Sequence, residues 1–114
     1  SDALLLASLL QKIQAKASAV ELPDGCTGVM NFTVSMSGNS LSVSANCQSG
    51  TVIMSELDFA LPHSDFVSTP SVIFDSRTGS ASSVDIDICG SGHKFRVSVN
   101  KVAYVGKPSY LGSC

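Results

Sequence analysis

Apolar residues recur every three or four positions in the first twenty residues of the chain, and later segments alternate apolar and polar residues. The 3.6-residue period predicts one amphipathic helix from residue 2 to residue 20. Ser1 or Asp2 can cap its first turn, and Pro23-Asp24-Gly25 ends it. The apolar stripe consists of Leu6, Leu9, Leu10, Ile13, Ala17 and Val20.

Residues 30–47 alternate with a period of two on both sides of Gly38-Asn39, which predicts a β-hairpin with a two-residue turn. A slip of one residue would turn one strand's apolar set to water, so the register is well determined. The expected pairs are Met36 with Leu41, Val34 with Val43, Phe32 with Ala45, and Met30 with Cys47.

The later segments predict further strands. A second hairpin is expected around Gly90-Ser91-Gly92, with Asp87 opposite Arg96 as an oppositely charged pair. The region from Pro62 to Asp65 is expected to be a loop. The expected extended segments are 51–57, 72–74, 84–89, 94–99 and 102–105.

These elements predict an α+β fold with a long N-terminal helix packed on an antiparallel β-sheet or on two small sheets. The chain has 114 residues, and two cores would each bury too little surface, so we expect a single domain. It divides into a helix at 1–20, a β-rich region at 26–105 and a tail at 106–114.

Four cysteines, Cys26, Cys47, Cys89 and Cys114, lack CxxC spacing and indicate two disulfides formed in an oxidising compartment. Three pairings are possible. The hairpin brings Cys47 near the strand that follows Cys26, and a bond from Cys89 to Cys114 would hold the tail. The geometry therefore favours Cys26–Cys47 with Cys89–Cys114, and zinc is not expected.

The composition indicates a surface that is poor in charged side chains. Charged residues make up 14% of the chain against 44% apolar residues, and 21 serines supply much of the polarity. The formal net charge is −2 and no basic cluster is present, which argues against general nucleic-acid binding. The sequence has no apolar run long enough for a membrane span and no signal-peptide pattern, so we expect a mature or trimmed product.

Two segments contain residue types that catalysis or metal binding uses. His63-Ser64-Asp65 has the residue types of a hydrolase triad, but adjacent side chains diverge, so we interpret it as a loop. His93 has no second ligand at metal-binding spacing, so we interpret it as a turn residue. We expect no enzymatic activity, no metal, no cofactor and no small-molecule substrate.

Three residues in the strands suggest other chemistry. Asp85 and Asp87 resemble paired carboxylates or a calcium site, but solvated acids that face Lys94 and Arg96 are the favoured interpretation. Asn31 begins an N-glycosylation pattern and is expected to face outward.

The start of the helix has leucines around most of its circumference. One sheet can cover only one stripe of a helix, so the remaining leucines are expected to bind a partner. The predicted partner-binding residues are Leu4, Leu5, Leu6 and Leu9.

Three segments, 72–80 (VIFDSRTGS), 84–89 (VDIDIC) and 95–102 (FRVSVNKV), carry a resemblance to a known family. Together with the order of helix and strands, the chain resembles type IV pilin-like proteins, in particular minor pilins and minor pseudopilins of the GspH/FimT type. Asn100-Lys101 stands where that family has Gly-Arg, and Asn100 can adopt a glycine-like left-handed turn.

The resemblance implies a structural, non-enzymatic subunit of a type IV pilus or of a type II secretion pseudopilus. It implies assembly with other pilin-like subunits through the helix and the sheet edges, and an inner-membrane anchor in an N-terminal segment absent here. The implied location is the periplasm and inner membrane, and then the extracellular filament.

Two alternatives stay open. The first is a pilus-tip DNA receptor for natural transformation, whose candidate contacts are Lys94, Arg96, Lys101 and Lys107. The second is an unrelated secreted β-rich adhesin domain.

Overall fold

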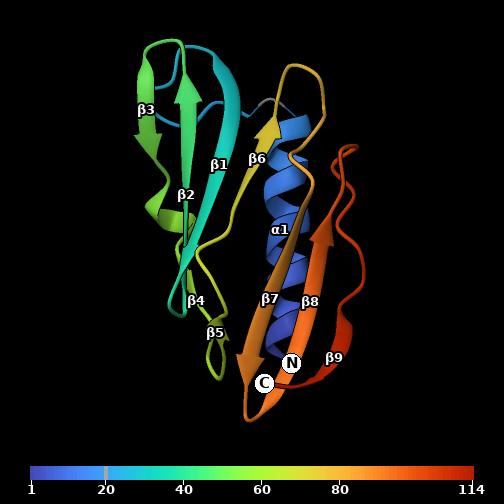
Figure 1. Ribbon diagram of the computed structural model, residues 1–114. Coiled ribbons are helices and arrows are strands. Elements are labelled where there is room, and N and C mark those ends of the chain that lie inside the picture. Colours follow the sequence, from blue (N-terminus) through green and yellow to red (C-terminus); the bar gives the residue numbers. More distant parts are fainter. Residues whose placement is uncertain (20) are drawn as a thin grey trace.

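A computed structural model describes residues 1–19 and 21–114 (Figure 1). Its helical elements are α1 (Asp2–Ser18) and the short 3-10 helix η1 (Ser55–Leu57). Its strands are β1 (Val29–Ser37), β2 (Ser40–Cys47), β3 (Gly50–Ile53), β4 (Phe59–Ala60), β5 (Asp65–Phe66), β6 (Ser71–Asp75), β7 (Val84–Gly90), β8 (His93–Val99) and β9 (Ser109–Ser113).

The chain is mostly β, so the expected α+β class with a long helix packed on a sheet is wrong. Strand residues make up 45% of the chain, and helical residues 18%. The strands form two antiparallel sheets, and α1 has only 17 residues. Short strands with weak alternation, such as β4, β5 and β9, account for much of the difference, because they carry little periodic signal in the sequence.

The first sheet has the strand order β3-β2-β1-β6, with β4 also paired to β2. The predicted hairpin pairs of Phe32, Val34 and Met36 are confirmed. Cys47, however, pairs with Val29 instead of Met30, because an irregularity between Val29 and Asn31 inserts an extra residue. The bulge buries Val29 and leaves Met30 half-buried.

The second sheet has the order β5-β7-β8-β9. The predicted β7–β8 register is confirmed, with Asp87 opposite Arg96. β5 also ties this sheet to the tip of the first hairpin, because the Phe66 N–H donates to the Gly38 carbonyl at 2.6 Å while Phe66 pairs with Ile88.

Helix α1 contacts β1 and β6 of the first sheet and β8 of the second. Figure 1 shows β1, β2 and β3 on one side of the view and β7, β8 and β9 on the other, with α1 at the junction. Leu6, Leu10 and Ile13 are fully buried in one core shared with both sheets. The helix is shorter than predicted and ends at Ser18, and the expected stripe member Val20 lies outside the described residues.

The C-terminal region differs most from expectation. Residues 102–105 form a turn instead of a strand, in which only Val105 makes an isolated bridge, to Val99. The tail at 106–114 contains strand β9, which pairs with β8. The β-rich region therefore continues to Ser113 and does not end at residue 105.

Candidate functional site

The first turns of α1 hold the leucines expected to contact partners. Leu4 and Leu5 are exposed, with 61% and 45% of their surface accessible. Leu6 is fully buried and Leu9 is half-buried against the core. The expectation is therefore wrong for Leu6, and Leu9 offers only part of its side chain, because two sheets cover more of the helix than one sheet would.

The beginning of α1 is fixed to the loop before β5. The Ser1 hydroxyl caps the helix by accepting the Leu4 N–H, with 3.4 Å between nitrogen and oxygen. The carboxylate of Asp2 is buried and accepts the backbone N–H of His63 at 2.8 Å. Leu4 and Leu5 are consequently presented from an anchored first turn.

The His63-Ser64-Asp65 segment is a structural connection. His63 and Asp65 are exposed, and no hydrogen bond joins the three side chains in residues 1–19 and 21–114. Ser64 packs directly on Gly90, where a Cβ would collide with the Ser64 hydroxyl and the His63 carbonyl. Gly90 thus permits the close approach of the loop to β7.

His93 contacts the neighbouring strand β9. Its Nδ1 lies 2.9 Å from the Tyr110 hydroxyl oxygen on β9. His93 also lines a shallow pocket of about 250 Å³ with His63 and Asp2. Across the part of the chain that the structure describes, no group of three or more His, Cys, Asp or Glu side chains could hold a metal ion.

The outer face of β7 and β8 carries a compact set of ion pairs. Arg96 donates from Nε and Nη2 to the two Asp87 carboxylate oxygens at 2.8 and 3.1 Å. Lys94 Nζ lies 3.8 Å from the same carboxylate, and Asp85 lies 3.8 Å from Arg96. The hydrogen bond from Arg96 lowers the pKa of Asp87, helped by the charges of Arg96 and Lys94, and the same bond raises the pKa of Arg96.

The candidate DNA contacts do not form one cationic patch. Lys94 and Arg96 are paired with aspartates on the sheet face. Lys101 and Lys107 belong to the turn region after β8, are exposed, and form no ion pair with any described residue. The pairing of Asp87 with two cations reduces the positive potential that a phosphate backbone would meet.

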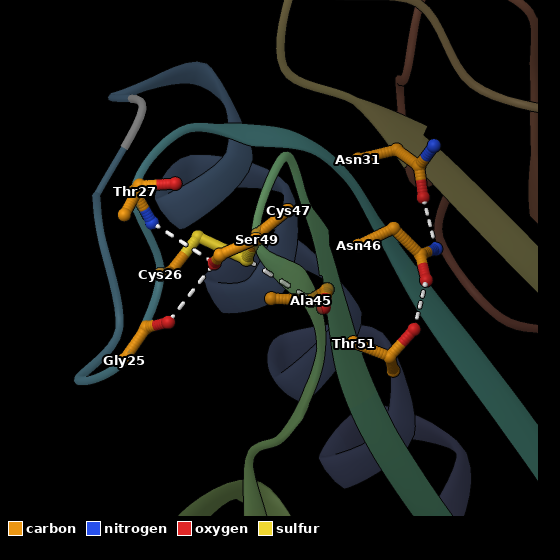
Figure 2. Close-up of a disulfide and its surroundings, with 9 residues drawn as sticks. All are labelled: Gly25, Cys26, Thr27, Asn31, Ala45, Asn46, Cys47, Ser49 and Thr51. Atoms are coloured by element: carbon orange, nitrogen blue, oxygen red, sulfur yellow. Dashed lines mark hydrogen bonds between the residues drawn. A yellow bond between two sulfur atoms is a disulfide. The ribbon is translucent and has the colours of Figure 1, made fainter.

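The two disulfides join the pairs favoured from the sequence, Cys26–Cys47 and Cys89–Cys114. Figure 2 shows the first bond beside Ser49. The Ser49 hydroxyl donates to the Gly25 carbonyl at 3.0 Å and accepts the Thr27 N–H at 3.3 Å. The disulfide and this serine together hold the segment before β1 against the end of β2.

A polar ladder crosses the outer face of the first sheet (Figure 2). The side-chain amide of Asn46 on β2 donates to Asn31 Oδ1 and, at 3.0 Å, to the Thr33 hydroxyl, both on β1. Its carbonyl accepts the Thr51 hydroxyl of β3 at 3.2 Å. Asn31 is half-buried in this ladder, so it is less free than a fully outward-facing acceptor asparagine would be.

A groove that the sequence pattern did not predict lies between β3 and the segment after α1. The groove has a volume of about 570 Å³. Its described lining residues are Lys16, Glu21, Leu22, Pro23, Asp24, Phe32, Val52, Ile53, Met54 and Glu56. We call it the β3 groove. The acidic residues Glu21 and Asp24 after the helix are visible in the sequence, but only the fold places them in the same groove as Glu56.

The structure also reveals an ordered turn after β8, which we call the lysine turn and define as residues 100–107. Asn100 Oδ1 accepts the N–H groups of Val102 and Tyr104, both at 3.0 Å. Ala103 has a φ of +63° and is buried. Asn100 does not use the left-handed conformation open to it: its side chain caps the turn, and Ala103 adopts that conformation.

Within the described residues, no helix is both long and apolar enough to span a membrane. Comparisons with family models, with curated proteins and with solved structures find no match for this chain.

Proposed function

We propose that this chain is a structural, non-enzymatic subunit of a surface filament, of the type IV pilus or type II secretion pseudopilus kind. The observation that carries the proposal is the pair of exposed leucines, Leu4 and Leu5, on the anchored first turn of α1. Two large apolar side chains open to water at neighbouring positions are costly unless another surface covers them.

Three other properties support a structural role. The surface is poor in charge, the two disulfides fasten both sheets, and segments 72–80, 84–89 and 95–102 resemble pilin-like proteins. The expected partners are other pilin-like subunits. The expected locations are the periplasm and inner membrane during assembly, and the cell surface afterwards. The proposal depends on this surface and not on a long packed helix, since α1 has only 17 residues.

The test is a double substitution, Leu4→Gln with Leu5→Gln, in the full gene product. We expect the variant to keep its fold and both disulfides but to lose co-purification with pilin-like subunits and incorporation into filaments. Val67→Gln is the matched control, because Val67 is 52% exposed and lies outside α1. Unchanged filament assembly by the double variant would contradict the proposal.

A second candidate is a secreted β-rich adhesin domain, and the predominance of strands with two disulfides favours it. The coding sequence upstream of Ser1 separates the two. A short basic leader ending in Gly, followed by an apolar stretch with an early Glu, supports a pilin, whereas a conventional signal peptide supports the adhesin.

No specific observation favours the DNA receptor, because Lys94 and Arg96 are paired with aspartates. A gel-shift titration at low salt tests it directly. Binding that Lys101→Ala and Lys107→Ala abolish would revive that function.

A further inference from the structure

The two most exposed large apolar side chains among the described residues lie on separate features. Val102 of the lysine turn is 76% exposed, and Ile53 of the β3 groove is 69% exposed. The lysine turn also holds Tyr104, which is 62% exposed, and the β3 groove also holds Leu22, which is 57% exposed. Exposed apolar clusters of this kind mark contact surfaces.

The β3 groove is acidic. Glu21, Asp24 and Glu56 line it together with the apolar residues. Lys16 is the cation among its described lining residues, and its ammonium is already paired with Glu21 at 3.1 Å. The groove therefore has two further carboxylates, those of Asp24 and Glu56, that no described cation neutralises.

The groove also opens beside the outer strand of the first sheet. β3 pairs with β2 on one side and ends the strand order on the other. The Met54 N–H donates to Val43 at 2.9 Å, so the alternation of an antiparallel ladder directs the peptide groups of Thr51 and Ile53 away from β2. Ile53 lines the groove, so its peptide groups are open to hydrogen bonds from a segment that enters the groove.

The lysine turn has the opposite charge and a fixed shape. Lys101 and Lys107 flank the exposed Val102 and Tyr104 and pair with no described acid. The two bonds to Asn100 and the buried Ala103 hold the backbone. A preorganised turn loses little conformational entropy when it binds.

We propose that the lysine turn of one copy of this chain docks into the β3 groove of the next copy. Val102 and Tyr104 enter the apolar part of the groove, and Lys101 and Lys107 face Asp24 and Glu56. An aromatic ring occupies a cavity of roughly 150 Å³, so a groove of about 570 Å³ has room for both side chains.

The lysine turn and the β3 groove lie on different sides of the molecule, so this contact leaves one turn and one groove free at the ends of any assembly. Figure 1 shows β3 at one side of the molecule and the turn after β8 at the other, with α1 between them. Two rigid copies cannot satisfy both contacts with each other, so each copy binds one neighbour through its turn and another through its groove. Such heterologous contacts propagate into a chain of subunits.

This inference rests on the proposed filament role, which it deepens by naming a contact between copies. The experiment uses two charge-reversed variants of the protein. The turn variant carries Lys101→Glu and Lys107→Glu, and the groove variant carries Asp24→Lys and Glu56→Lys. All four residues are exposed, and circular dichroism with disulfide mapping checks that both variants fold.

Sedimentation velocity at low salt measures self-association up to about 1 mM protein, because a single small contact of this kind is weak. We expect concentration-dependent association of the wild type and an apparent Kd raised roughly tenfold or more in each variant alone. An equimolar mixture should associate again, because each variant's turn then meets a groove of opposite charge. Lys12→Glu, on the exposed side of α1, should behave as the wild type does.

A wild type that stays monomeric over this range overturns the inference, and so does a mixture that fails to regain association. Val102→Ser supplies a test independent of charge and should weaken association in the wild-type background. If association follows these expectations while the Leu4 and Leu5 variant enters filaments normally, the docking stands and the filament proposal fails. If the wild type is monomeric but the leucine variant blocks filament assembly, the filament proposal stands without this docking.

Discussion

The outer faces of the two sheets join their polar side chains across strands by different interactions. On the first sheet an uncharged ladder runs from Asn31 through Asn46 to Thr51. On the second sheet Asp87 meets Arg96 and Lys94 in ion pairs. Both faces satisfy their polar groups across strands, but the cross-strand contacts of the second face are ion pairs, which respond to pH and salt.

The period of two in each strand therefore specifies which face is exposed to water but not how the polar groups on that face are joined. Amide and hydroxyl hydrogen bonds keep their geometry over a wide pH range. Ion pairs near the surface weaken as salt screens them. We therefore expect the cross-strand contacts of Asn46 on the first sheet to keep their strength as salt is added, and those of Asp87 on the second sheet to weaken.

The largest expected effect compares the contributions of the two sheets to the shared core. Phe32 of the first sheet is fully buried, whereas Phe95 of the second is half-buried. Phe32→Ala should lower the free energy of unfolding by about 3–5 kcal/mol because it leaves a cavity. Phe95→Ala should lower the free energy of unfolding by clearly less, because Phe95 is only half-buried. Urea titration measures both, and equal losses would show that the sheets contribute equally to the core.

The next effect concerns the second disulfide. Cys114→Ser should lower the free energy of unfolding by about 2–4 kcal/mol, because the closed loop no longer restricts the unfolded chain. β9 is the outer strand of its sheet, so limited proteolysis should cut within 106–113 while the first sheet survives. The control is Cys26→Ser, for which cleavage should fall before β1. The opposite pattern would refute the assignment of one bond to each sheet.

A smaller effect distinguishes the two outer faces. Asp87→Asn should lower the free energy of unfolding by about 1 kcal/mol at low salt and by less at high salt. The folded-state pKa of Asp87 lies below its ordinary value of 3.8, so the pair stabilises the fold above about pH 4. This contribution is lost as the pH falls through the lowered pKa.

The matching control on the first sheet is Asn46→Ser. Its cost, measured by chemical denaturation, should not change with salt. A salt-independent cost for Asp87→Asn would show that the ion pair acts through packing and not through charge.

The smallest effect separates the two hairpin turns. Ser91 and Gly92 both have positive φ, at 54° and 77°, which is the pattern of a type I′ turn. Ser91→Gly should therefore stabilise the protein by about 0.5–1 kcal/mol, because glycine adopts this conformation without steric cost. Gly38 has a φ of +59°, so Gly38→Ala in the first hairpin should destabilise it. Thermal melts compare the two, and a destabilised Ser91→Gly variant would contradict this explanation.

The sequence predicted the parts of the fold in which a local pattern decides the structure. Alternation with a short turn determined both hairpin registers, and the spacing of apolar residues located α1. The bulge at Val29 escaped prediction, because an inserted residue interrupts the alternation without a distinctive residue type. β9 escaped because its five residues, Ser109–Ser113, have little apolar periodicity and are positioned by β8 and the Cys89–Cys114 bond.

The candidate surfaces were predictable only in part. The sequence shows an excess of leucine at the start of the helix. Which of these leucines are exposed, such as Leu4, and which are buried, such as Leu6, depends on the second sheet. Asp24 and Glu56 both line the β3 groove although they are far apart in the sequence. They share this groove only when β3 folds back beside the end of α1.

The two disulfides have a mechanical consequence. Each bond closes a loop within one half of the molecule, spanning 21 and 25 residues, and neither joins the two sheets. Under tension applied to the two ends of the chain, the noncovalent core between the sheets can yield, but the looped residues cannot extend. At about 3.6 Å per residue, the oxidised chain would reach a contour length roughly 17 nm shorter than the reduced chain. A chain pulled at its two ends would thus have a built-in limit to its stretching, set by its oxidation state.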